Sequence, residues 1–277
     1  MKDIHKNFHC GGSLINSRWV LTAGHCVSIC QENGWDQAWS PCIDSDPSHI
    51  RVQLGRHDRT AVEKYLELEI SDIFVHPDYR KIYFHKTTKQ FDIALMRLKT
   101  EVDFMQYPNI RPVCLPENSN QDYAGMDVTL TGWGITNNNR SSIPTILQEI
   151  AGHVLTNKQC ADGMADCYGN KIDCSESGVP HHLICTEFPS GKFCNGDSGG
   201  PLVSTAAAGH DGVTPGENYV QIGVVSFSKG GCDGVHYGGY ARVSEMIGWI
   251  EQTVGTGHTD CSKDDGTDIY GVDTNFL

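Results

Sequence analysis

The stretch Gly196-Asp197-Ser198-Gly199-Gly200-Pro201 places one hydroxyl among glycines. Far upstream lies Thr22-Ala23-Gly24-His25-Cys26, and between the two lies Asp92-Ile93-Ala94-Leu95. An imidazole, a carboxylate and a hydroxyl therefore follow one another in the order His, Asp, Ser. This is one of three unrelated chain orders that build the same nucleophilic triad.

Each of these motifs has an ordinary interpretation when it stands alone. Taken alone, His25 in its apolar run would be a packed core histidine. Asp92 alone would be an acid at the edge of a strand, and Ser198 alone would be a turn residue. An alkyl hydroxyl is a poor nucleophile until a base lies within hydrogen-bond reach, and that base needs a group that fixes its tautomer. All three side chains together, in this order, favour a catalytic triad.

The rest of the chain predicts an all-β fold. Short apolar runs are separated by clusters of Gly, Pro, Asn and Asp, a pattern typical of antiparallel sandwiches and barrels. Strands are expected at residues 19–22, 50–54, 93–98, 128–131 and 220–227. Residues 245–254 carry apolar side chains at helical spacing after Ser244, so we expect a helix there with Ser244 as its N-cap.

These motifs resemble the trypsin/chymotrypsin family of serine endopeptidases, over residues 8–254. The resemblance implies two packed antiparallel β-barrels with the active site in the cleft between them. It divides residues 1–254 into barrel one, to about residue 118, barrel two, about 125–243, and the C-terminal helix. Residues 255–277 form a polar, acidic tail.

The resemblance also implies the chemistry. Ser198 attacks the scissile carbonyl, His25 takes its proton and later gives it to the leaving amine, and Asp92 orients His25. The backbone N–H groups of Gly196 and Ser198 form the oxyanion hole. Gly24 departs from the family pattern, in which alanine is usual.

Asp197 has an activation role in the family, where its carboxylate pairs with an α-amino group freed by proteolysis. Residues 8–15 resemble the family's second or third strand, so the first strand and the activation motif are expected to be absent from this chain. We therefore expect the protein to be made as a zymogen and residues 1–277 alone to be weakly active or inactive. The resemblance extends to invertebrate clip-domain proteases, which have an upstream regulatory module.

The predicted primary specificity pocket differs from that of trypsin-like members. Lys192 stands at its base, where they have an aspartate, and Phe193 narrows it. One interpretation is a preference for acidic or small side chains; the other is that Lys192 turns to solvent and leaves a shallow pocket. The remaining expected substrate-binding residues are Ser226, Phe227, Ser228 and Gly238.

Twelve cysteines indicate disulfides and an oxidising, extracellular compartment, although the N-terminus has no apolar leader. The family implies the pairs Cys10–Cys26, Cys160–Cys185 and Cys194–Cys232. Two further pairs are guesses from position, Cys30–Cys42 and Cys167–Cys174. Cys114 bridges either to a separate light chain or pro-segment, or to Cys261. A zinc site at Cys160, Cys167 and Cys174 is disfavoured because their spacing fits no common zinc motif.

Charge and composition limit the classes of binding partner that we expect. The net charge of −13 disfavours nucleic acid, and no apolar run is long enough for a membrane span. We expect protein or peptide substrates, protein inhibitors and no cofactor. Calcium is not expected, because Arg56 and Leu66 stand where the family's calcium loop has acidic ligands. Asn139 is a candidate glycosylation acceptor.

A second class of function stays open at this stage. A non-catalytic homologue that binds or regulates a partner would keep the fold and lose the chemistry. The intact His25, Asp92 and Ser198 favour an enzyme, whereas Lys192 and Phe193 favour the homologue. A structural or lectin-like β protein has no specific feature in its favour.

Overall fold

The structure is a computed structural model. It describes residues 1–3, 10–29, 43–61, 65–79, 91–116, 121–136, 143–164, 179–189, 193–205, 219–228 and 237–255. Several residues singled out in the sequence lie outside these ranges: Cys30, Cys42, Asn139, Cys167, Cys174, Lys192, Cys232 and Cys261.

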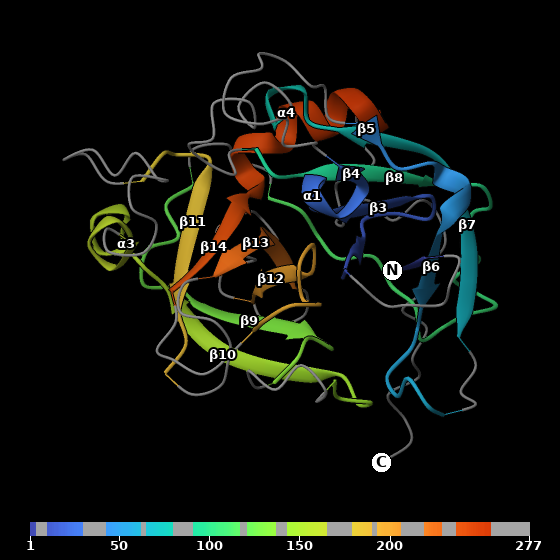
Figure 1. Ribbon diagram of the computed structural model, residues 1–277, viewed down its shortest axis with the longest axis horizontal. Coiled ribbons are helices and arrows are strands. Elements are labelled where there is room, and N and C mark those ends of the chain that lie inside the picture. The colour runs from blue at the N-terminus through green and yellow to red at the C-terminus, as the bar shows by residue number, and fades with distance from the viewer. Residues whose placement is uncertain are drawn as a thin grey trace, which may run out of the picture.

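Two six-stranded antiparallel β-sheets dominate the described fold, as expected for an all-β protein, and Figure 1 shows them side by side. The first is a curled six-stranded sheet that does not close on itself. Its strands, in spatial order, are β1 (Lys2–Asp3), β6 (Ile50–Leu54), β7 (Leu66–Val75), β8 (Ala94–Leu98), β3 (Trp19–Thr22) and β2 (Ser13–Leu14). Every neighbouring pair is antiparallel.

The second sheet is a closed barrel, which removes the exposed strand edges that an open sheet would have. Its six strands, in order around the barrel, are β10 (Gln148–Val154), β11 (Leu183–Glu187), β14 (Tyr237–Arg242), β13 (Val220–Ser228), β12 (Pro201–Ser204) and β9 (Asp127–Gly132). All of these pairs are antiparallel as well.

The strands expected from the sequence are all present, within two residues at each end. Residues 50–54 form β6, for example, and residues 220–227 form all but the last residue of β13. Short elements complete the fold: α1 (Gly24–Val27), β4 (Ser28–Ile29), β5 (Ile43–Asp44), the 3₁₀ turn η1 (Pro47–His49) and α3 (Asn157–Met164).

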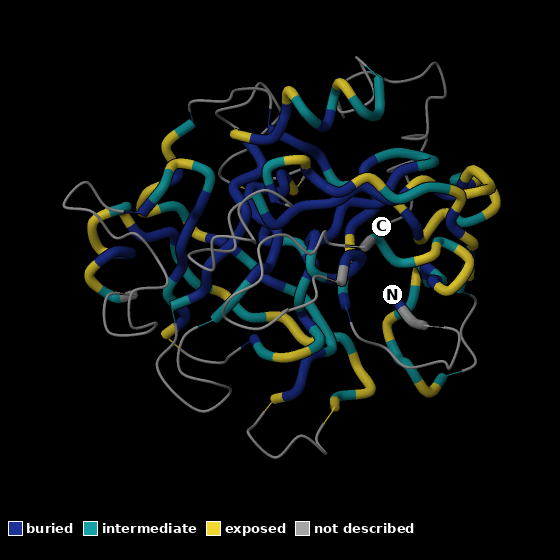
Figure 2. Tube along the Cα trace, turned by 45° about the horizontal axis from the view of Figure 1, so that its top comes forward, coloured by how far each residue is buried: buried dark blue, intermediate teal, exposed yellow. Residues whose placement is uncertain are grey.

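Strand β13 lies where the two sheets meet, and this position explains its long apolar run. Ile222 and Val225 pack in the barrel's own core, whereas Val224 belongs to the core of the first sheet. A strand that is covered on both faces is apolar almost throughout rather than alternating. Figure 2 shows the buried segments gathered in the middle of the molecule.

The C-terminal helix α4 (Val243–Val254) follows β14 directly but packs on the core of the first sheet. Its apolar residues Met246, Ile247 and Ile250 are buried there, so the helix connects the two halves. The expected start of the helix was wrong. It begins at Val243, and Ser244 lies inside the first turn, where it is buried and makes no side-chain cap.

None of the helices that the structure describes has the length and apolar character needed to cross a bilayer.

Candidate active site

His25 is placed by the end of a buried strand and by a disulfide. Strand β3 ends at Thr22, and the chain then makes the single turn α1, which carries His25. Cys26 in the same turn is bonded to Cys10, with 6.1 Å between their Cα atoms. The strand and the disulfide together fix the turn on both sides.

Asp92 lies directly against His25. The carboxylate Oδ2 is 2.8 Å from His25 Nδ1, and Oδ1 accepts a hydrogen bond of 2.9 Å from the backbone N–H of His25. The side chain of Asp92 is 0% exposed and that of His25 is 23% exposed. An ionised carboxylate only accepts hydrogen bonds, so Nδ1 carries the proton and Nε2 has a free lone pair. The Asp92 carboxylate is thus shielded from solvent, whereas the His25 side chain is partly exposed and its Nε2 lies 4.0 Å from the sulfur of Cys26.

Ser226 makes a third contact with this carboxylate. Its Oγ donates a hydrogen bond of 2.5 Å to Asp92 Oδ2, and the residue is buried. The sequence suggested Ser226 only as part of a substrate-binding strand. Its bond to Asp92 joins residues 134 positions apart, and no local pattern in the chain could have signalled it.

Gly24, the departure from the family pattern, has a structural reason. A Cβ on this residue would lie 3.0 Å from Cδ1 of the buried Tyr79 and 3.3 Å from Asp92 Oδ1. Both distances are tighter than ordinary van der Waals contact. The glycine thus leaves room for the Tyr79 ring beside the Asp92 carboxylate.

The loop that carries Ser198 is bonded to both halves of the molecule. The carbonyl of Ser198 accepts a 2.7 Å hydrogen bond from Gly11 N, near the first sheet, and Gly199 N donates a 2.8 Å bond to Val225 O in β13. A Cβ on Gly199 would lie 3.1 Å from Ala23 N, two residues before His25. The backbone of Ser198 is therefore held against the segments that carry His25 and Ser226.

In the part that the structure describes, the hydroxyl of Ser198 makes no contact with His25 that corresponds to the expected triad. Among the described residues, no hydrogen bond joins Ser198 Oγ to His25 Nε2. The structure thus brings His25 and Asp92 into contact and places the Ser198 backbone beside them. Catalytic hydrogen bonds are often long in unliganded enzymes and tighten when substrate binds.

The glycine before Asp197 has a backbone that side chains rarely adopt. Gly196 has φ of 106°, and a Cβ there would lie 3.1 Å from the Cα of Gly134. In the part of the chain that the structure describes, the N–H groups of Gly196 and Ser198 donate to no acceptor. Two backbone N–H groups of this kind, one on each side of Asp197, could bind a negatively charged oxygen.

Asp197 is a buried carboxylate held by backbone alone. Oδ1 accepts from Gly134 N at 2.7 Å and Oδ2 from Cys194 N at 2.9 Å, and the residue is 5% exposed. Burial raises its pKa to about 6, although the two N–H donors oppose that shift. No described cation forms an ion pair with it.

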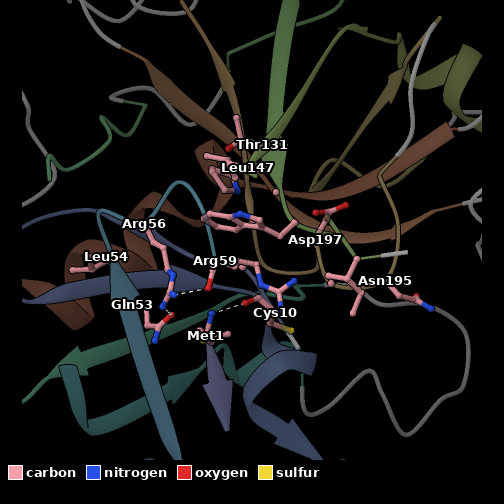
Figure 3. A pocket seen from close by; sticks show the side chains of 18 of the residues that line it. Met1, Cys10, Gln53, Leu54, Arg56, Arg59, Thr131, Leu147, Asn195 and Asp197 are labelled. Atoms are coloured by element: carbon pink, nitrogen blue, oxygen red, sulfur yellow. Dashed lines mark hydrogen bonds between the residues drawn. The ribbon is translucent and has the colours of Figure 1, made fainter. Parts of the chain in front are cut away.

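A cavity of about 570 Å³ opens beside Asp197, between the two sheets. Figure 3 shows Met1, Arg56 and Arg59 with Asp197 around it. The Met1 amine donates to Cys10 O at 2.6 Å, and burial lowers its pKa to about 5. The Arg56 guanidinium donates hydrogen bonds to the side-chain oxygen of Gln53 and to the carbonyl of Arg59.

Of the residues expected to bind substrate, Phe193 is the most informative. It is 2% exposed, and its ring centroid lies 5.6 Å from that of Tyr240 and 6.0 Å from that of Phe188. A Cβ on Gly238 would lie 2.6 Å from Phe193 Cε1, so this ring fills the space that the glycine leaves open. Phe227 is likewise packed over Gly239.

Two expected disulfides are present, Cys10–Cys26 and Cys160–Cys185. Cys114 and Cys194 are also disulfide-bonded, and their partner cysteines lie outside the described residues. One group of potential metal ligands occurs in the described part of the chain: Cys10, His25 and Cys26. Two of these sulfurs bond each other, so they cannot act as the thiolate ligands that a zinc site needs.

Several known proteins resemble this chain over most of its length. A model of the family described as trypsin matches residues 2–250. Serine proteinase stubble of Drosophila melanogaster is 30% identical over 250 residues, which are 88% of this chain and 27% of that protein. Clotting factor C of Tachypleus tridentatus is 31% identical over 259 residues, covering 88% of this chain and 22% of its own length. Limulus clotting factor C of Carcinoscorpius rotundicauda gives the same values. The chain spans about a quarter of the length of these relatives.

Proposed function

The chain belongs to the trypsin family, and we propose on that basis that it is the catalytic domain of a serine endopeptidase. In this proposal Ser198 is the nucleophile, His25 the general base and Asp92 the residue that orients it. The observation that carries the proposal is the 2.8 Å contact between His25 Nδ1 and the fully buried carboxylate of Asp92. That contact occupies Nδ1 and leaves the lone pair of Nε2 available to act as the base.

The proton path follows from this arrangement. His25 Nε2 takes the proton of Ser198 as the hydroxyl attacks the scissile carbonyl carbon, and a tetrahedral oxyanion forms. The imidazolium then protonates the leaving amine, and the acyl-enzyme remains. Water attacks the ester by the same route, with His25 again as base. Asp92 stays ionised throughout and stabilises the imidazolium, with Ser226 Oγ donating to the same oxygen.

The oxyanion hole is proposed at Gly196 and Ser198. Both N–H groups are without acceptors among the described residues, and the φ of 106° at Gly196 turns its peptide in a way that a side chain would resist. Preorganised donors of this kind cost no reorganisation when charge develops in the transition state.

We propose that Asp197 controls whether this hole is formed. Its buried carboxylate receives N–H groups from Gly134 and Cys194, and the latter begins the loop that carries Gly196 and Ser198. A carboxylate with a pKa of about 6 in a cavity is ready to accept a cation, and an α-amino group freed by proteolysis fits that chemistry. The protein is then made as a zymogen.

The primary specificity pocket is proposed to be shallow. The Phe193 ring lies over Gly238 and against Tyr240, and so occupies the space that a long substrate side chain would need. Small side chains at the cleavage position are expected. A fluorogenic peptide library tests this, and best cleavage after Arg or Lys would contradict it.

The disulfides indicate the compartment in which the proposed enzyme acts. Four of the described cysteines form two disulfides within this chain, which indicates an extracellular protein acting on protein or peptide substrates and open to protein inhibitors. Cys114 already forms a disulfide here, so a link to a separate light chain would require that bond to exchange. Non-reducing electrophoresis of the natural protein tests for such a second chain.

Burst kinetics with a chromogenic ester test the proposed function. The full-length protein, after proteolytic processing, is expected to release about one equivalent of product rapidly and then turn over slowly, because the acyl-enzyme accumulates. Ser198→Ala should abolish the burst, and Asp92→Asn should slow it by about 10⁴-fold. A processed protein that binds the ester but shows neither a burst nor turnover would be a non-catalytic homologue.

A further inference from the structure

Phe91 has a backbone conformation that side chains of its size rarely take. Its φ is 51°, and among the described residues no other residue except glycine has a positive φ. A bulky residue in that region is an outlier, and such a conformation persists only where the surrounding structure enforces it. The next residue is Asp92, so the strained backbone leads directly into the carboxylate that bonds His25.

The ring of Phe91 stacks on two imidazole rings from distant parts of the chain. The His76 ring lies 4.9 Å away, centroid to centroid, at an interplanar angle of 10°. The His182 ring lies 4.3 Å away at 21°. His76 directly follows β7 in the first sheet, and His182 directly precedes β11 in the barrel. The phenyl ring thus joins the two halves of the molecule beside Asp92.

Both imidazole rings are anchored in turn. The His76 ring packs at 5.0 Å on Trp249 of α4. The carbonyl of His182 accepts a 2.9 Å hydrogen bond from Arg242 N at the end of β14. Burial lowers the pKa of His182 to about 4, with smaller contributions from His76, His181 and Arg242, so this ring stacks as a neutral imidazole at neutral pH.

The peptide backbone around Asp92 is closed by two further bonds. Ile93 N donates to Phe91 O at 2.8 Å, which makes a tight turn with Asp92 at its centre. His76 N donates to Ile93 O at 3.1 Å and ties that turn to the end of β7. The direction of the Asp92 side chain therefore depends on the dihedral angles of Phe91.

We propose that Phe91 is a positioning residue: stacked on His76 and His182, it holds the left-handed backbone that aims the Asp92 carboxylate at His25. This inference rests on the proposed function, because the positioned pair is the proposed base and its orienting acid. Phe91 itself touches neither substrate nor the reacting atoms. Its removal should change turnover much more than substrate binding.

The primary test compares Phe91→Ala with Phe91→Tyr in the processed full-length protein. Alanine removes the stacking ring, so kcat should fall by about tenfold to a hundredfold, with KM within about twofold of wild type. Tyrosine keeps the ring and should restore kcat. The matched control is Phe74→Ala in β7, which deletes a ring that lies 5.5 Å from Trp19, in the same sheet but outside the Asp92 turn. That control should lose stability without a comparable loss of kcat.

A second pair of variants addresses the partner ring. His182→Ala should lower kcat in the same direction as Phe91→Ala, whereas His182→Phe, which keeps an aromatic ring, should not. If Phe91 and His182 act through the same stack, their effects should not be independent. The fold-loss of kcat in the double alanine variant should then be smaller than the product of the two single fold-losses. Equal kcat values in His182→Ala and wild type would count against the stack.

A spectroscopic readout separates this inference from the proposed function. The proton on His25 Nδ1 is protected by its bond to Asp92, and its low-field NMR resonance should be present in wild type and Phe91→Tyr and lost or rapidly exchanging in Phe91→Ala. This signal needs no turnover. If the wild-type protein has no peptidase activity but its low-field resonance still depends on an aromatic ring at position 91, the proposed function is wrong and the positioning role of Phe91 stands. An unchanged resonance in folded Phe91→Ala would overturn the positioning role, whatever the activity.

Discussion

At the scale of single residues, burial decides what each carboxylate does. Asp92 is fully shielded and its charge is stabilised by His25 and Ser226, whereas Asp197 is nearly as buried and has only two backbone N–H groups. A buried charge without a counterion is costly, and the rise in the pKa of Asp197 to about 6 expresses that cost.

Asp197→Asn should remove a pH dependence of stability. The pKa of Asp197 rises from 3.8 to about 6 on folding, so its contribution to stability is full below pH 3.8 and is lost as the pH rises through about 6. The shift corresponds to about 3 kcal/mol. Urea unfolding of the unprocessed protein, in which Asp197 has no cation partner among the described residues, should show between pH 4 and 7 that wild type loses this amount relative to the Asn variant. Parallel pH profiles of the two proteins would contradict it.

Gly196→Ala should damage the proposed oxyanion hole. The added Cβ meets Gly134 Cα at 3.1 Å and also disfavours the φ of 106°, so the N–H group should turn out of place. Loss of one such donor costs about 10²- to 10³-fold in kcat.

Gly125→Ala is the matched control for that change. Gly125 also has a positive φ, of 80°, but nothing lies within 4 Å of its Cβ position. This variant should lose about 1 to 2 kcal/mol of stability and keep its kcat. Equal kcat values in the two variants would mean that the Gly196 N–H has no catalytic role.

At the scale of elements, the site is assembled from ends of strands. His25 follows β3, Asp92 precedes β8 and Ser226 lies near the end of β13. Rigid strands place each side chain, and the turns between them supply the unusual backbone angles at Phe91 and Gly196. Helix α4 supports this arrangement, because Trp249 contacts His76 while the buried face of the helix packs on the first sheet.

Ile250→Ala in α4 should destabilise the whole domain. Ile250 is 0% exposed in the core of the first sheet, so its truncation should lower the unfolding free energy by about 2 to 5 kcal/mol. Gln252→Ala, at an exposed position of the same helix, should change it by less than about 0.5 kcal/mol. Thermal or urea unfolding measures both. Similar losses in the two variants would show that α4 does not couple to the core as described.

At the scale of the whole molecule, the sequence predicted what depends on local pattern. Apolar runs and turn residues located the strands, and three short motifs singled out His25, Asp92 and Ser198, of which the structure brings His25 and Asp92 into contact. The start of α4 was misplaced because Ser244 fits a capping pattern, while tertiary packing buries it. The bond between Ser226 and Asp92, and the stack on Phe91, join segments that only the closed fold brings together, so no spacing in the chain encodes them visibly.

The most direct test of the central claim is covalent labelling with a fluorophosphonate probe, followed by mass spectrometric mapping of the adduct. The processed full-length protein should be modified at Ser198, because the proposed base His25 and the buried carboxylate of Asp92 would activate that hydroxyl. His25→Ala should reduce the labelling rate by at least a hundredfold. Absence of an adduct at Ser198, or labelling that proceeds equally fast in His25→Ala, would contradict the account.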